Sequence, residues 1–330
     1  MKAYRLDSYP EGNDFAASIA LVDQPDPVAN EGEVVFTNEL LSLDAGTRMW
    51  MTPRTDSYQP PIPLGSVVPG LALGRVTESR AEGFAPGDLV RAFGQWAEKS
   101  VVRPELSGLV KLDTSVADAR QHFGALGMNG WTALVGIEDV GRTKAGDTVL
   151  VSAAAGATGI LATQIAKILG AHVIGIAGGA EKCAFLTEKL GLDGAIDHRG
   201  DDVEGAIAKA APNGVNVYFD NVGGPLLDAV LPNMAHYGRI AICGLIAGYA
   251  EAQPGPRRFD QILARRLQVT GFFSPDFMDR GPELTERLKG WLDDGRLVVP
   301  FEETQGFENL LTAYAKLFTG GNIGKVVVRV

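Results

Sequence analysis

Residues 149–170 read VLVSAAAGATGILATQIAKILG, which is an apolar β-prone run, a turn of small residues and a stretch with helical spacing. Aligned on the dinucleotide fingerprint G-x-G-x-x-G, Ala154, Gly156 and Gly159 take the three glycine positions. Gly156 would let the backbone approach a pyrophosphate, which the N–H groups of the next helix would face, and Gly159 would permit close helix–strand packing. The alternative is a glycine-rich turn without a ligand, and the αβ pattern around the turn favours the fingerprint.

The alternation of strand-like and helix-like segments continues beyond this turn. The predicted strands are 148–152, 172–176, 194–196, 215–219, 239–243 and 268–271. Apolar residues at helical spacing predict helices at 159–169, 180–190, 203–210, 225–234 and 259–266. Strands that alternate with helices indicate an α/β fold, with a doubly wound parallel sheet of the Rossmann type.

The N-terminal third of the chain has a different pattern. Short β-prone runs at 33–37, 71–77, 88–93 and 96–102 are separated by Gly and Pro, which indicates a β-rich and antiparallel region. The tail KVVVRV, 325–330, follows a last helical stretch at 282–293 and has no place in the parallel sheet. We therefore expect a discontinuous β-rich domain, 1–124 with 299–330, and a dinucleotide-binding domain at 125–298.

Composition and charge exclude several classes of protein. The 330 residues include 30 basic and 40 acidic ones, a net charge of −10, with no basic cluster that could neutralise a row of phosphates, so we expect no nucleic-acid partner. Two cysteines cannot form a four-cysteine zinc site. The start, MKAYRLDSYPEG, has charges where a secretory signal needs an apolar core, and no apolar run approaches about 18 residues. We expect a cytoplasmic protein without a membrane partner.

The end of the second predicted parallel strand bears on the choice of nucleotide. NAD-binding folds commonly place an Asp or Glu there to bind the ribose 2′-hydroxyl, but here HVIGI runs into Ala177, Gly178 and Gly179. Lys182 follows in the first turn of the next helix, where its ammonium could meet a 2′-phosphate. NADP is therefore favoured, although Glu181 beside Lys182 also fits a solvated helix start.

Several separated segments, in this order along the chain, resemble the zinc-independent medium-chain dehydrogenase/reductases. The branch is that of the prostaglandin reductases, leukotriene B4 12-hydroxydehydrogenases and 2-alkenal or curcumin reductases, and the resemblance covers nearly the whole chain. The matching segments are LSLDAGTRMWM (41–51), YQPPI (58–62), GMNGWTA (127–133), AAAGATGILATQ (153–164), GIAGGAEKC (175–183), VYFDNVGG (217–224), CGLIAGY (243–249) and NIGKVVV (322–328).

The resemblance implies a GroES-like first domain, a Rossmann second domain, bound NADPH and a homodimer. It places the pyrophosphate at Gly156, Ala157, Thr158 and Gly159, the adenosine phosphate at Gly178 and Lys182, and the nicotinamide at Asn221 and Asn322. This chain also departs from the family pattern. His198 stands where the family often has a tyrosine that helps to hold the 2′-phosphate, Asn129 replaces the proline of a Gly-Met-Pro-Gly turn, and Ala45 replaces the proline of an Asp-Pro segment.

No metal is expected. Related alcohol dehydrogenases hold a catalytic zinc through a cysteine and a Gly-His-Glu segment, where this chain reads Gly70-Leu71-Ala72. The four histidines, 122, 172, 198 and 236, show neither i,i+4 pairing nor a cysteine companion. Without a Lewis acid to polarise the oxygen, oxidation of alcohols is disfavoured.

The remaining feasible chemistry is hydride transfer to the β-carbon of an α,β-unsaturated aldehyde or ketone. The enolate oxygen then needs hydrogen-bond donors, and the resemblance links Tyr58 and Tyr249 to the substrate. Either tyrosine could instead only pack against the substrate. A quinone reductase of the same superfamily is the alternative enzyme, and a nucleotide-binding protein without turnover is the alternative of another class. Asp44 and Arg48 could form a buried pair or guide the substrate.

Overall fold

The computed structural model describes residues 1–57 and 59–330 of the chain. These residues divide into two compact units. Residues 123–300 form one unit, and residues 1–122 together with 301–330 form the other. Within the described residues, none of the helices is long and apolar enough to cross a membrane.

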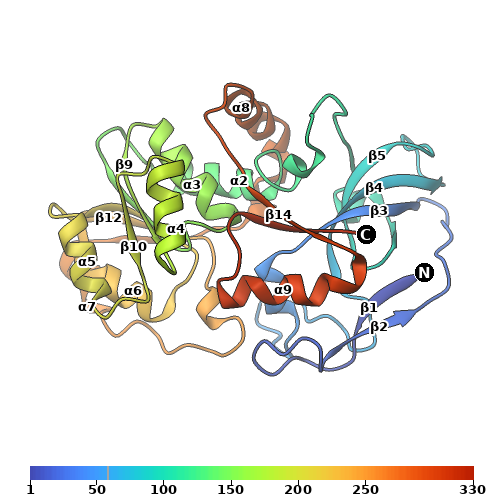
Figure 1. Ribbon diagram of the computed structural model, residues 1–330, viewed down its shortest axis with the longest axis horizontal. Helices are drawn as coiled ribbons and strands as arrows, with labels where there is room; N and C mark the ends of the chain where they lie inside the picture. Colours follow the sequence, from blue (N-terminus) through green and yellow to red (C-terminus); the bar gives the residue numbers. More distant parts are fainter. Residues whose placement is uncertain (58) are drawn as a thin grey trace. The chain divides into compact units, whose positions relative to one another are not determined.

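Unit 123–300 is built on a parallel sheet of strand order β10-β9-β8-β11-β12-β13 (Figure 1). The strands are β8 (Thr148–Val151), β9 (His172–Ala177), β10 (Gly194–Asp197), β11 (Val215–Asp220), β12 (Met234–Ile242) and β13 (Gln268–Gly271). The prediction of a doubly wound parallel sheet is confirmed. Strand β12 begins earlier than predicted, because the helix before it ends at Val230 and only a short 3-10 turn, Leu231–Asn233, follows.

The helices of this unit precede, connect or follow the strands of the sheet. They are α2 (Met128–Val135), α3 (Ala157–Ile168), α4 (Ala180–Ala184), α5 (Val203–Ala210), α6 (Gly224–Val230), α7 (Asp260–Arg265) and α8 (Gly281–Asp293), and α4 continues into a π turn, Phe185–Lys189. The strand order reverses between β8 and β11, so right-handed crossovers place α3 and α4 on one face and α5, α6 and α7 on the other. Figure 1 shows α5, α6 and α7 gathered together.

The core of the unit lies between these layers. Leu150, Ile174, Tyr218 and Ile240, from four neighbouring strands, are all buried there. Strands β8, β9 and β11 are buried along most of their length because helices cover both faces of the sheet, which explains why they read as apolar runs, whereas the edge strand β13 is largely exposed. All carboxyl ends of the parallel strands lie at one edge, and the strand order reverses between β8 and β11, which is the position at which open α/β sheets bind ligands.

The other unit is β-rich. Its main sheet has the order β14-β15-β3-β4-β5-β7, β6 pairs with β3, and β1 and β2 form a separate antiparallel pair. The elements are β1 (Lys2–Leu6), β2 (Ile19–Asp23), β3 (Val34–Ser42), β4 (Pro69–Ser79), β5 (Leu89–Gln95), β6 (Lys99–Val102), α1 (Pro104–Ser107), β7 (Val110–Lys111), β14 (Phe301–Gln305), α9 (Leu310–Thr319) and β15 (Lys325–Arg329). Trp96 and Tyr314 meet edge to face in its core, with ring centroids 4.9 Å apart.

An ion pair between a buried lysine and a partly exposed aspartate joins β15 to the segment after β3. Lys325 is 1% exposed, and its Nζ donates to Asp44 Oδ1 at 2.5 Å and to Leu43 O at 3.0 Å. Ser42 Oγ donates to the other carboxylate oxygen of Asp44 at 2.5 Å. The expected pairing of Asp44 with Arg48 is wrong, because the buried Arg48 guanidinium donates instead to the main-chain oxygens of Pro10, Gly12 and Met51.

Candidate functional site

The turn after β8 has the backbone shape that a phosphate-binding fingerprint requires. Gly156 is the N-cap residue of α3, and a Cβ on Gly159 would lie only 2.3 Å from the carbonyl oxygen of Ala153. A side chain at Gly159 would therefore push the helix away from the turn. Ala153 itself has a φ of +46°, a strained conformation for a residue with a side chain, and such strain is found at functional turns.

The first turn of α3 leaves its N–H groups for an external acceptor. Gly156 has no side chain to cap the helix, and no side-chain cap bond is present there. Thr158 Oγ1 accepts a hydrogen bond from Asn129 Nδ2 at 3.0 Å, so the residue that departs from the family's proline fixes this hydroxyl. Gly156, Ala157, Thr158 and Gly159 together form a cradle that suits a pyrophosphate.

The ends of β9 and β10 form the neighbouring part of this edge. Asp197 Oδ1 accepts from the N–H groups of Gly179 at 2.9 Å and of Arg199 at 3.0 Å, which ties the two strand ends together. These backbone hydrogen bonds, with the charges of His198 and Arg199, hold the pKa of Asp197 below its usual range. The Asp197 carboxylate thus stabilises the conformation of the two loops that follow these strands.

Basic side chains lie over the glycines at the end of β9. A Cβ on Gly178 would be 2.8 Å from His198 Nε2 and 3.1 Å from Arg199 Nε, and a Cβ on Gly179 would be 3.3 Å from Arg199 Nη1. Lys182 lies in α4, directly after these glycines. The structure therefore adds Arg199 to the expected set of Gly178, Lys182 and His198. The available signal was a second basic residue directly after His198.

Asn221 lies at the carboxyl end of β11, beside the fingerprint turn. Its main-chain N–H donates to Ser152 Oγ at 2.8 Å, and its side-chain Nδ2 donates to Ser152 O at 2.7 Å. The carbonyl acceptor fixes the orientation of the amide and leaves Asn221 Oδ1 as the acceptor end of the side chain. This orientation suits a donor such as a carboxamide.

Tyr249 follows the next strand, in the loop 243–249. Its hydroxyl oxygen accepts from the N–H of Leu245 at 3.2 Å and lies 2.9 Å from the position that a Cβ on Gly244 would take. The same Cβ position is 3.5 Å from the carbonyl oxygen of Asn221, so Tyr249 and Asn221 approach each other over Gly244. The tyrosine hydroxyl is therefore held at the carboxyl edge of the sheet.

Asn322 and Tyr58 are the remaining expected site residues. Asn322 belongs to the β-rich unit, is buried, and donates from Nδ2 to Gly324 O at 3.0 Å. Tyr58 lies outside the described residues.

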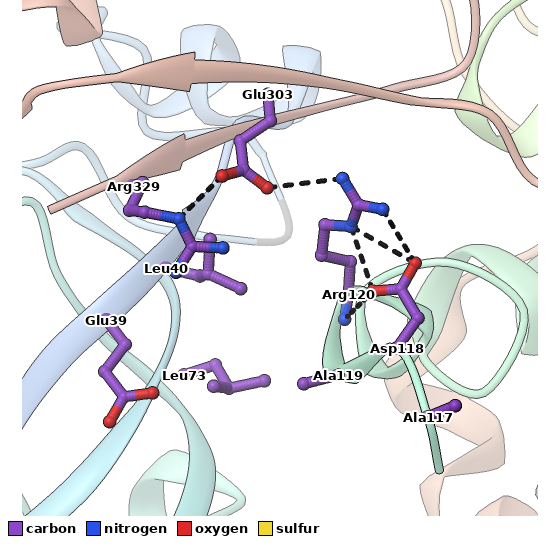
Figure 2. Close-up of a pocket in the computed structure, with 9 residues that line it drawn as sticks. All are labelled: Glu39, Leu40, Leu73, Ala117, Asp118, Ala119, Arg120, Glu303 and Arg329. Atoms are coloured by element: carbon purple, nitrogen blue, oxygen red, sulfur yellow. Dashed lines mark hydrogen bonds and ion pairs between the residues drawn. The ribbon is translucent and has the colours of Figure 1, made fainter.

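A cavity of about 520 Å³ in the β-rich unit is a different feature (Figure 2). Arg120 bonds Asp118 at 2.9 Å and Glu303 at 3.2 Å, and Arg329 bonds Glu303 at 2.6 Å. The two arginines that line the cavity thus form ion pairs with neighbouring carboxylates, and these ion pairs connect the segment 117–120 to β14 and β15. We assign this cavity a structural role. In residues 1–57 and 59–330, no group of three or more His, Cys, Asp or Glu residues could hold a metal ion.

Comparison with known proteins gives matches over both units. Residues 2–112 match the family model described as the N-terminal domain of oxidoreductase, and residues 157–289 match the one described as zinc-binding dehydrogenase. The NADPH-dependent curcumin reductase of Escherichia coli strain K12 is 36% identical over 98% of this chain and 95% of the relative. The NADP(+)-dependent 2-alkenal reductase of Nicotiana tabacum is 36% identical over 98% of this chain and 94% of the relative.

A solved structure matches equally well. CurA from Vibrio vulnificus, crystallised in complex with NADPH, superposes with a TM-score of 0.93 at 35% identity. The match covers 100% of this chain and 99% of that one.

Proposed function

Because the chain belongs to the zinc-independent medium-chain dehydrogenase/reductases, in the branch of the curcumin and 2-alkenal reductases, we propose that it reduces the C=C bond of α,β-unsaturated aldehydes or ketones with NADPH. The observation that carries the proposal is the identity with these two reductases along almost the whole chain. A 2-alkenal is, by its name, an aldehyde conjugated to a carbon–carbon double bond.

The residues at the carboxyl edge of the parallel sheet fit NADPH. The cradle at Gly156–Gly159 would hold the pyrophosphate, since its N–H groups face outward from a helix N-terminus. Lys182, His198 and Arg199, beside Gly178, would surround the 2′-phosphate. Asn221 would accept a hydrogen bond from the nicotinamide carboxamide, and we propose Asn322 of the other unit for the same end of the cofactor.

When bound, NADPH supplies a hydride to the β-carbon, while the π electrons of the enone move onto its carbonyl oxygen. The chain must then stabilise the negative charge on that oxygen. Tyr249 is the proposed donor, and the N–H that it accepts from Leu245 polarises its O–H and strengthens it as a donor. Tyr58 is proposed as a second donor. The proton that completes the α-carbon comes from Tyr249 or from water.

The proposal is tested by following a label. NADPH deuterated at C4 would be incubated with enals, enones and quinones, and the products examined by NMR and mass spectrometry. Reduction of an enal or enone with deuterium at the β-carbon, and hydrogen from water at the α-carbon, is the expected result. Turnover of quinones alone would favour a quinone reductase, and tight NADPH binding without turnover would favour a non-catalytic protein. A homodimer and a cytoplasmic location stay predictions.

A further inference from the structure

A buried carboxylate that none of the proposed steps uses lies directly beneath the site. Asp220 is the last residue of β11 and is 0% exposed. No basic side chain pairs with it among the described residues, and burial raises its pKa against the lowering effect of its hydrogen bonds. A buried carboxylate without a cation is costly, so the fold retains it against an energetic penalty.

One oxygen of this carboxylate collects four hydrogen bonds. Asp220 Oδ1 accepts from Tyr218 Oη at 2.8 Å, Ser152 Oγ at 3.1 Å, Val222 N at 2.9 Å and Gly223 N at 2.9 Å. Asp220 Oδ2 has no partner within the described part of the chain. The four donors come from β11, from the turn after β8 and from the loop after β11. Asp220 therefore fixes two of the loops that form the candidate site.

Ser152 links Asp220 to Asn221 through hydrogen bonds. The hydroxyl that donates to Asp220 accepts the main-chain N–H of Asn221 at 2.8 Å, and the carbonyl of the same serine accepts Asn221 Nδ2 at 2.7 Å. If Asp220 were removed, Ser152 Oγ would lose its carboxylate acceptor, and both supports of Asn221 would be free to shift.

The main chain from Asp220 onward also carries the loop of Tyr249. The carbonyl oxygen of Asp220 accepts from the N–H groups of Cys243 at 2.8 Å and Gly244 at 3.0 Å. The next two carbonyl oxygens, of Asn221 and Val222, accept from Ile246 at 3.2 Å and Ala247 at 3.1 Å. The loop 243–249 is thus laid along residues 220–222.

We propose that Asp220 is a positioning residue that sets Asn221, and through it the nicotinamide ring, without touching the cofactor or the substrate. The inference rests on the proposed function, because it assigns Asn221 to the nicotinamide. It distinguishes Asp220 from an ordinary core residue: its loss should loosen the nicotinamide end of the cofactor while the adenosine end, held by other residues, stays bound.

The test compares Asp220→Ala, Asp220→Asn and Ser152→Ala with the wild type. Asp220→Ala should lower kcat for an enal by about 10- to 100-fold, because small misplacements of reacting groups have effects of this size. Binding of 2′,5′-ADP, which has no nicotinamide, should stay within about threefold. Deuterium transfer from the two C4-labelled forms of NADPH should lose its single-face specificity. Asp220→Asn keeps the acceptor oxygen and should restore most of kcat.

Ser152→Ala keeps the test open if Asp220→Ala does not fold, since it removes only the hydroxyl that links Asp220 to Asn221. Thr163→Val is the matched control, because it removes another buried hydroxyl, bonded to Ile160 O at 2.8 Å, and should leave kcat and stereospecificity unchanged. Unchanged kcat and stereospecificity in Ser152→Ala and Asp220→Ala would overturn the proposal. So would parallel losses of kcat and 2′,5′-ADP binding, which indicate a general role in folding.

A measurement without turnover separates this inference from the proposed function. The side-chain amide NMR signal of Asn221, identified by its absence in Asn221→Asp, should shift with NADPH but not with 2′,5′-ADP. Asp220→Ala should abolish that shift. Wild-type protein that reduces no enal or enone would contradict the proposed function, and the amide shift would still decide the role of Asp220. An identical shift in Asp220→Ala would overturn it.

Discussion

Selectivity for NADPH over NADH should depend on Arg199 as well as Lys182. Arg199 lies over Gly178 and Gly179, with Nε and Nη1 3.1 and 3.3 Å from the positions their Cβ atoms would take, and a 2′-phosphate at the end of β9 would meet this guanidinium. NADH offers only a neutral hydroxyl at the same place. Removing either cation should therefore weaken binding of NADPH and leave NADH nearly unaffected.

The expected loss of NADPH affinity depends on how far each cationic side chain is exposed to solvent. A hydrogen bond to a charged group contributes about 1.5–3 kcal/mol when protected from water, and solvent screening lowers this for an exposed side chain. Arg199 is exposed and Lys182 is half-buried. Arg199→Ala and Lys182→Ala should each weaken NADPH by about 1–2 kcal/mol, or roughly 5- to 30-fold. The double variant should lose less than the sum, because both cations act on one phosphate.

Both cofactors would be titrated by fluorescence against wild type and variants at low and high salt. The preference of the wild type for NADPH should shrink near 1 M salt, where the Debye length falls to about 3 Å. Lys209→Ala is the matched control, since it removes an exposed cation from the last turn of α5, away from the carboxyl edge. Equal losses for NADH and NADPH in Arg199→Ala, or no loss for NADPH, would refute the assignment.

Tyr249→Phe should lower kcat for an enone by about 30- to 1,000-fold with little change in NADPH binding, since a lost donor to a developing oxyanion costs about 2–4 kcal/mol. An unchanged kcat would mean that Tyr249 only packs against the substrate. Asp44→Ala should destabilise the protein by about 2–3 kcal/mol, because it leaves the buried Lys325 ammonium without its carboxylate. Adding Lys325→Met should recover most of this loss of stability. A double variant with a lower melting temperature than Asp44→Ala would contradict this role of the ion pair. Arg329 holds the pKa of Glu303 below its usual range, so the stability that Glu303 contributes is present above the ordinary glutamate pKa and is lost as the pH falls through the lower folded value. Glu303→Gln should accordingly flatten the acid limb of a plot of melting temperature against pH, and an unchanged limb would count against this ion pair. Dialysis against a strong chelator should leave the rate of NADPH oxidation unchanged, whereas stoichiometric zinc with activity lost on its removal would contradict the metal-free expectation.

The parallel sheet could be predicted from sequence because its signals are local. The strands β8, β9 and β11 are short apolar runs bounded by glycines or a helix start, and covering both faces of a sheet produces this pattern. Strand β12 departs from the pattern, because its first half, from Met234, is not continuously apolar. Its pairing with β11 shifts register, and Tyr237 has a φ of +61°, so this stretch is held by tertiary contacts and not by its own pattern.

The parts of the site that escaped prediction depend on contacts between distant residues. Asp220 reads as a polar residue at a strand end, and the role proposed for it rests on the hydrogen bond that it accepts from Ser152, 68 positions earlier. Arg199 reads as one charge in a polar loop until Asp197 folds that loop back over the end of β9. Neither contact has a periodic signature, so pattern and propensity could not reveal them.

The two substitutions that depart from the family pattern in the parallel unit have a common location. Asn129 bonds Thr158 in the pyrophosphate cradle, and His198 lies with Arg199 over Gly178, where the 2′-phosphate is proposed. Both would therefore act on the phosphate end of the proposed cofactor site. Asn221 and Tyr249, at the proposed hydride-transfer end, stand within segments that match the family. If cofactor affinity depends on Asn129 and His198, this chain should differ from its relatives in its affinity for NADPH and in the salt dependence of that affinity. If the reaction depends on Asn221 and Tyr249, it should differ less in the bond that it reduces.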